Sequence, residues 1–173
     1  MITIQVEDFN NFSQKNYNDI ISSIQFHQLT CSCGHSACLA VHAYYYRSIQ
    51  TPEKKVRIRI CRVKCSVCGR THALLVVSIV PYSQIPVDIQ RQIAMSVEDQ
   101  VPYKDICEEH PHINDNSIKA IIRRYKKRWK ERLASEKIPL SPVRILTKQC
   151  LALYSAQFMQ VWSTANLPFT GTT

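Results

Sequence analysis

Residues 65–69 read CSVCG and residues 31–38 read CSCGHSAC, and these two cysteine clusters decide the fold that the sequence predicts. In a C-x-x-C-G knuckle two thiolates reach one tetrahedral ion, and the glycine permits the tight backbone turn behind them. Six of the eight cysteines lie between Cys31 and Cys68. In a reducing compartment this spacing indicates a metal rather than disulfides, so the sequence predicts a zinc site.

The CSVCG knuckle supplies one pair of ligands. The other cluster must supply the remaining two ligands, but it offers more than two, namely three thiolates and an imidazole. Cys33 and Cys38 pair more easily, since the single residue between Cys31 and Cys33 is short for a knuckle. Cys31 is the main alternative, and His35 or His72 are weaker ones. The predicted zinc ligands are Cys33, Cys38, Cys65 and Cys68.

The predicted zinc has a structural role. A catalytic zinc keeps one coordination position open and usually has a carboxylate nearby as general base. Neither CSCGHSAC nor CRVKCSVCGRTH, residues 61–72, contains a carboxylate. We therefore expect the ion to hold together a ribbon that is too small to fold on its own core.

Strand-forming residues surround the two clusters. AVHAYYYRSI and VRIRICRVKC flank the turn TPEKK and predict a β-hairpin, and THALLVVSIV predicts a third, buried strand. The apolar positions of the second strand slip by one residue between Ile60 and Cys61, which predicts a β-bulge or bend there. Three strands with metal knuckles at one end predict an antiparallel zinc ribbon.

The rest of the sequence predicts helices. Apolar residues every four positions indicate a helix over about Pro86–Asp99, and a short one is expected over Tyr103–Glu109. Asp115 or Asn116 is the expected N-cap of a longer helix from Ser117 to about Leu133. The short helix, the turn and the longer helix match a helix-turn-helix pattern.

The predicted fold class is α+β, with a small three-stranded antiparallel zinc ribbon followed by an α-helical helix-turn-helix domain. A final helix is expected over residues 143–162, more often part of a core than a dimer interface, although a homodimer through it stays an alternative. The predicted divisions are an unassigned N-terminal segment at 1–28, the ribbon at 29–82, the DNA-binding domain at 83–140, and a C-terminal helix and tail at 141–173.

Positive charge gathers in two stretches of this chain. The net charge is +9 and the pI about 9.3, and sixteen of the twenty-two Lys and Arg lie at 47–70 or 119–132. SIKAIIRRYKKRWKERL, residues 117–133, places apolar residues on one helical face and cations on the other, with only Glu131 as an acid. A solvated surface helix would carry interleaved ion pairs, so this helix favours DNA contact. The predicted DNA-binding residues are Asn116, Ser117, Lys119, Arg123, Arg124, Lys126, Lys127 and Lys130, of which the first four are expected nearest the bases and the later cations on phosphates.

Several longer motifs carry a resemblance to a known family. CSCGHSACL, HAYYYRSI, RVKCSVCGRTHALL, IVPYSQIP, QFMQVW and LPFTGTT resemble an uncharacterised bacterial family of transposase-like proteins with an N-terminal zinc ribbon and a helix-turn-helix. The resemblance covers most of the chain from Leu29 onward. It implies a mobile-element setting and double-stranded DNA as the partner.

We therefore expect a double-stranded DNA-binding protein with structural zinc that binds transposon ends or regulates an insertion element. A transposase or recombinase is a candidate further partner. The start MITIQVEDFNNFSQKNYND lacks the features of a signal peptide, which predicts a cytoplasmic, nucleoid-associated protein with no membrane contact.

Two alternatives stay open. One is a transposase or nuclease with intrinsic cleavage, although the thirteen acidic residues are scattered. The other is an RNA-binding or adaptor protein, in which the tyrosines at 44–46 could stack on bases. For the class of protein, an enzyme is the less favoured interpretation.

Overall fold

The computed structural model describes residues 1–4, 6 and 12–129. The final helix predicted over residues 143–162, and Lys130 among the predicted DNA-binding residues, lie outside this part. Within it, no helix combines the length and the apolar character needed to cross a membrane.

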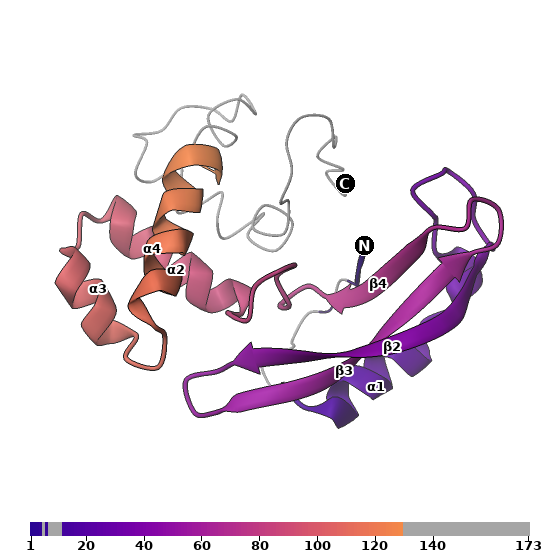
Figure 1. Ribbon diagram of the computed structural model, residues 1–173, viewed down its shortest axis with the longest axis horizontal. Helices are drawn as coiled ribbons and strands as arrows, with labels where there is room; N and C mark the ends of the chain where they lie inside the picture. Colours follow the sequence, from indigo (N-terminus) through magenta and orange to yellow (C-terminus); the bar gives the residue numbers. More distant parts are fainter. Residues whose placement is uncertain (5, 7–11, 130–173) are drawn as a thin grey trace.

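A four-stranded sheet in the order β1-β4-β3-β2 forms one end of the molecule (Figure 1). β2 (Leu39–Gln50) and β3 (Lys55–Cys65) form the predicted antiparallel hairpin, and β4 (Thr71–Val76) pairs with β3 only over residues 62–64. β1 (Ile2–Ile4) pairs with β4 in parallel.

The predicted fold class is therefore wrong. The sheet is mixed and has four strands, because the N-terminal segment left unassigned from the sequence supplies β1 on the outer edge of β4. The same segment forms α1 (Gln14–Ser23), which packs against β3, and the 3-10 turn η1 (Phe26–Gln28). The sheet is thus not a minimal ribbon, because the N-terminal segment contributes both a strand and a covering helix.

The predicted irregularity of the hairpin lies on the partner strand. Pairing runs from Val41 with Val63 directly to Ala43 with Arg62, so His42 is the extra residue of a bulge in β2. β3 itself keeps a continuous register through Ile60 and Cys61, although both of its residues there are fully buried. The bulge therefore lies in β2, opposite residues 62 and 63, rather than in β3 at Ile60 and Cys61 as predicted.

The side chains of α1 complete the backbone hydrogen bonds of β3 where β4 turns away. Tyr17, which is fully buried, accepts a bond of 2.8 Å from the Cys61 N–H through its hydroxyl, and the same hydroxyl donates 2.9 Å to the Leu74 carbonyl. The Gln14 amide binds both the N–H (2.6 Å) and the carbonyl (3.3 Å) of Arg59. Two side chains of one helix therefore replace the missing part of a strand.

Three further helices form the other end of the molecule. They are α2 (Val87–Glu98), α3 (Tyr103–Glu109) and α4 (Asp115–Arg124), and α4 continues into a π-helical turn, η2 (Tyr125–Trp129). Asn114, rather than Asp115 or Asn116, caps α4, because its side chain accepts a 2.8 Å bond from the Ser117 N–H. The buried core of this end includes Ile93, Ile106, Ile118, Ile121 and Tyr125.

Hydrogen bonds from β2 connect the hairpin to the helical end. The guanidinium of Arg47 donates to the carbonyl of Val80 and, at 2.7 Å, to that of Ser83. The N–H of Gln50 donates 2.8 Å to Gln84, and its side-chain amide donates to the carbonyl of His112, in the turn before α4. The end of the hairpin is therefore attached both to the segment before α2 and to the base of α4.

Tyr17→Phe should test the hydrogen bonds between α1 and the sheet. The substitution keeps the ring but leaves the buried Cys61 N–H and Leu74 carbonyl without this partner, which should cost about 1–3 kcal/mol of unfolding free energy in a urea titration. Tyr46→Phe is the control, since Tyr46 is exposed, and it should change stability by less than about 0.5 kcal/mol. Equal stability of the two variants would contradict the proposed role of the hydroxyl.

Candidate functional site

Four cysteines from two loops meet at the end of the sheet away from α2–α4. Cys31 and Cys33 lie in the loop before β2, Cys65 ends β3, and Cys68 lies in the turn to β4. Their sulfur atoms all lie within 4.8 Å of one another. This cluster can bind a metal ion.

The spacing of the sulfur atoms fits a tetrahedral metal. Sγ of Cys31 lies 3.6 Å from that of Cys68, and Sγ of Cys33 lies 3.8 Å from that of Cys65. An ion with metal–sulfur bonds of about 2.3 Å in tetrahedral geometry places its ligands about 3.8 Å apart. Each of these short distances joins a cysteine of the first loop to one of the second, so an ion at this point would fasten the two loops together.

Both loops turn at a left-handed glycine despite their different spacing. Gly69 N–H donates to the carbonyl of Cys65, and Gly34 N–H donates to that of Cys31. Gly34 (φ 88°) and Gly69 (φ 70°) are both left-handed, and a Cβ at either would meet no atom within 4 Å. Glycine is thus favoured here by its backbone conformation rather than by space. The short C-x-C-G sequence therefore forms a knuckle, which its spacing alone did not indicate.

Cys38, one of the predicted ligands, lies beside the cluster rather than within it. Its Sγ is 3.4 Å from Sγ of Cys65 and donates a 3.1 Å bond to the His35 carbonyl. Burial, together with the neighbouring Cys65, raises the pKa of the Cys38 thiol to about 11. His35 approaches Cys33 instead, with Nδ1 3.5 Å from its sulfur.

His72, which the sequence offered as a weaker alternative ligand, lies against Cys31 but is not one of the four clustered residues. It is 4% exposed, and its Nε2 lies 3.2 Å from Sγ of Cys31. Burial lowers the pKa of His72, which favours the neutral ring. The Nε2–H tautomer of this neutral ring would donate a hydrogen bond to the Cys31 sulfur, as outer partners of metal ligands commonly do. Its position in β4, beside the second knuckle, was the available sequence signal.

The environment of the cluster favours ionised sulfur at one position in each loop. The Cys68 N–H holds the pKa of Cys65 down to about 6, and the Cys33 N–H lowers the pKa of Cys31. The Cys68 thiol tends to keep its proton. The Arg70 N–H favours its thiolate, but burial and the nearby thiols raise its pKa to about 12. Further thiolates in so small a volume repel one another, and a bound cation removes that repulsion.

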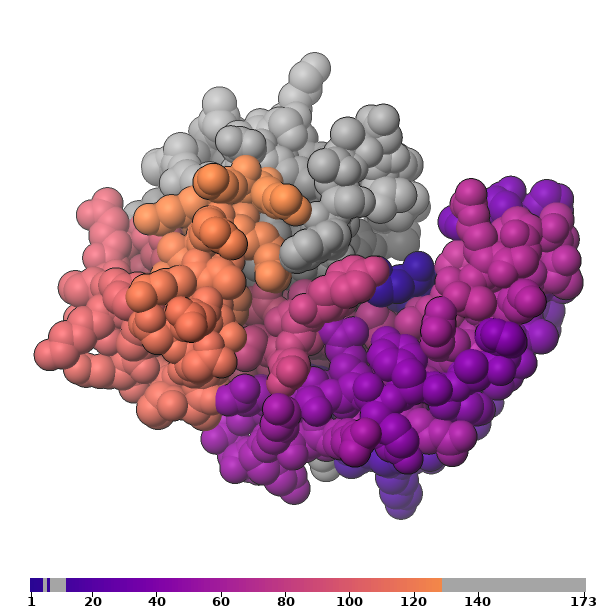
Figure 2. All heavy atoms as spheres, in the orientation of Figure 1, coloured from indigo at the N-terminus to yellow at the C-terminus, as the bar shows by residue number. Residues whose placement is uncertain are grey.

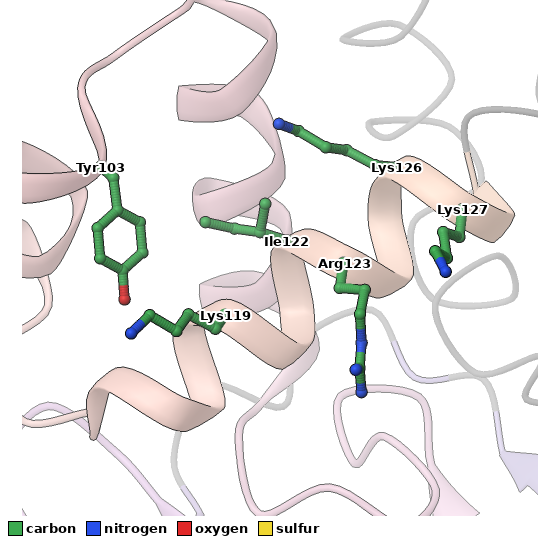
Figure 3. Close-up of a pocket in the computed structure, with 6 residues that line it drawn as sticks. All are labelled: Tyr103, Lys119, Ile122, Arg123, Lys126 and Lys127. Carbon is green, nitrogen blue, oxygen red and sulfur yellow. The ribbon is translucent and has the colours of Figure 1, made fainter.

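A second feature, the basic helix face, lies at the other end of the molecule, on α4 and η2. Lys119, Arg123, Lys126 and Lys127 line an open hollow of about 380 Å³ together with Ile122 and Tyr103 (Figure 3). Lys119 points toward the ring of Tyr103, whereas Arg123 and Lys126 point apart from each other (Figure 3). The sequence had given Tyr103 no role, because nothing near it signals contact with α4.

The predicted DNA-binding residues differ in how accessible they are. Asn116 is exposed at the start of α4 and Ser117 is partly exposed. Lys119 makes an ion pair of 2.6 Å with Asp115, which also accepts a hydrogen bond from Tyr103. Arg123, Lys126 and Lys127 are exposed and make no ion pair with any described residue.

Arg124 points toward α2 rather than outward. Its guanidinium donates 3.4 Å to the side-chain oxygen of Gln90, which is fully buried. Burial and the nearby cations Arg128 and Arg123 lower the pKa of Arg124. Among the predicted DNA-binding residues that the structure describes, Arg124 is the one whose guanidinium contacts a buried side chain of α2.

Comparison with known proteins adds no relative to this description. No family model matches the chain, and neither a curated protein nor a solved structure matches it. Interpretation of both features therefore depends on their own geometry.

Replacing Cys31 and Cys38 in turn should identify the fourth ligand. One thiolate contributes about a quarter of a zinc-binding free energy of roughly 10–16 kcal/mol, so Cys31→Ser should weaken Co²⁺ binding about a hundredfold or more. Cys38→Ser should leave the affinity and the tetrahedral Co²⁺ absorption bands nearly unchanged. The opposite ranking in the same titration would place Cys38 in the coordination sphere instead.

Proposed function

We propose that the cysteine cluster holds a structural zinc ion. Four thiolates at tetrahedral spacing bind zinc in preference to harder cations such as magnesium or calcium. The proposed ligands are Cys31, Cys33, Cys65 and Cys68, which fill all four positions and leave none open for a substrate. Cys38 then keeps its proton and its hydrogen bond to the His35 carbonyl.

We further propose that the chain binds double-stranded DNA through the basic helix face of α4 and η2. The observation that carries this proposal is the set of exposed cations at Arg123, Lys126 and Lys127, with Lys119 one turn before them and no described acid paired to the first three. Like charges at this spacing destabilise a helix unless a polyanion neutralises them.

The proposed binding mode follows from the direction of α4. An α-helix fits the major groove of B-DNA, and the exposed Asn116 and partly exposed Ser117 at its start are placed to reach base edges. Lys126 and Lys127, about three turns later, would contact phosphates. Arg124 would instead hold α4 against α2 through Gln90 and so keep the basic face in position.

The biological setting rests on the sequence motifs. CSCGHSACL and RVKCSVCGRTHALL resemble transposase-like proteins of bacterial mobile elements, so we propose a cytoplasmic protein that binds transposon ends or regulates an insertion element. A transposase or recombinase recruited to that DNA would supply the cleavage chemistry. Among the described residues the cysteine cluster is the one group with metal-binding geometry, so no carboxylate group of that kind favours intrinsic cleavage.

Zinc removal should test the structural role. Treatment with a chelator should lower the melting temperature of the protein, because it releases the bond between the loop before β2 and the turn after β3. Added zinc should restore the original value, with one ion per chain by elemental analysis. A melting temperature that does not respond to the chelator would contradict the proposal.

Lys126→Ala with Lys127→Ala should test the proposed DNA contact. Fluorescence anisotropy against random duplex DNA over a salt series should show weaker binding and a salt dependence shallower by about 1.8, or about 0.9 per lost phosphate contact. The matched control is Arg91→Ala with Lys104→Ala. It removes the same net charge from α2 and α3, where both cations are paired with acids. Equal losses in the two double variants would mean that net charge, not this face, governs binding.

A further inference from the structure

The outer face of the β2–β3 hairpin carries an alternating series of rings and guanidinium groups. The guanidinium of Arg59 lies 4.2 Å from the ring centre of Tyr44, and that of Arg57 lies 4.3 Å from the ring centre of Tyr46. Strand register explains the pattern. Arg59 is directly opposite Tyr46 but packs on Tyr44, which is the next ring on the same face of β2. We call these four residues the tyrosine–arginine ladder.

The ladder is exposed although its rings are large and apolar. Tyr44 is 49% and Tyr46 60% exposed, and both arginines are exposed. Neither arginine makes an ion pair with a described acid. Tyr45, between the two tyrosines, points to the opposite face, which packs against the core with Ile58 and Ile60. The ladder is therefore not part of the core.

We propose that the tyrosine–arginine ladder binds single-stranded DNA. Successive positions on one face of a strand are about 6.8 Å apart, so the stacked rings and guanidinium groups form one row along which the bases of an extended strand can lie. Bases stack on aromatic rings and on guanidinium planes, and the arginines also pair with phosphates. The cation–π contacts hold the rings and guanidinium groups in order before a strand arrives.

The choice of DNA rests on the function proposed above and on the position of Gln50. This residue lies on the same face as the ladder, and its side chain donates to the carbonyl of His112, just before α4 begins. Figure 2 shows atoms of the hairpin (purple) and of α4 (orange) on one visible face of the molecule. Gln50 thus links the hairpin that carries the ladder to the turn before α4, so an unpaired segment next to a duplex on α4 would lie near this hairpin.

The experiment compares oligo(dT) of about 16 nucleotides with duplex DNA, each titrated into the full chain at matched salt. Tyr44→Thr with Tyr46→Thr removes the rings and keeps β-branched residues in the strand, so the hairpin should still form. We expect oligo(dT) affinity to fall about tenfold or more, with duplex affinity nearly unchanged. Tyr44→Phe with Tyr46→Phe should retain binding. Tyr82→Asn should also retain it, since Tyr82 is an exposed tyrosine outside the ladder and asparagine tolerates its left-handed backbone (φ 58°).

A second measurement uses the unmodified protein and does not depend on how a variant folds. Oligo(dT) containing 5-iodouracil should form photo-crosslinks that mass spectrometry maps to Tyr44 or Tyr46. Crosslinks found only elsewhere, or an oligo(dT) affinity that the threonine variant does not change, would overturn the proposal. Binding of oligo(U) without binding of oligo(dT) would overturn the assignment to DNA. Loss of oligo(dT) binding alone leaves the duplex function standing, whereas absent duplex binding contradicts that function separately.

Discussion

Four sulfur atoms from two loops share one small volume at the open end of the β2–β3 hairpin, and together they can bind a metal ion. The chain between Cys33 and Cys65 contains the whole hairpin, so an ion that joins these two residues closes that hairpin at its open end. The opposite end is closed by the turn between β2 and β3 and by the bonds of Arg47 and Gln50 to the helical end. A two-stranded hairpin alone is marginally stable in water, and a bound ion would fasten the end of this one that lies away from the helices.

The sequence could predict the elements whose residues repeat with a clear period. β2, β3, β4, α2 and α3 lie close to where the alternation and the four-residue spacing placed them, and α3 has the expected bounds. The knuckles were recognisable because cysteine spacing and glycine are local signals. The choice between Cys31 and Cys38 was not local, since it depends on how the first loop turns at Gly34 and which sulfur it directs at the second loop.

The N-terminal part was missed for a physical reason. A strand of three residues, Ile2–Ile4, is too short to show a period, and its parallel pairing with β4 brings together residues more than seventy positions apart. In α1, only Tyr17, Ile20 and Ile21 mark a helical face, and polar residues fill the rest. On α4 the charge pattern was visible, but the inward direction of Arg124 was not, because Gln90 comes from another helix.

The way α1 covers β3 has a consequence for how copies of this protein behave toward one another. A strand with unpaired N–H and carbonyl groups is a template on which another chain can add a strand, and this is a common route to aggregation. Along residues 59–61 those groups bond to Gln14 and Tyr17, so a second copy finds no free backbone groups with which to pair there. Two polar side chains on a short helix thus block strand addition at this point of β3.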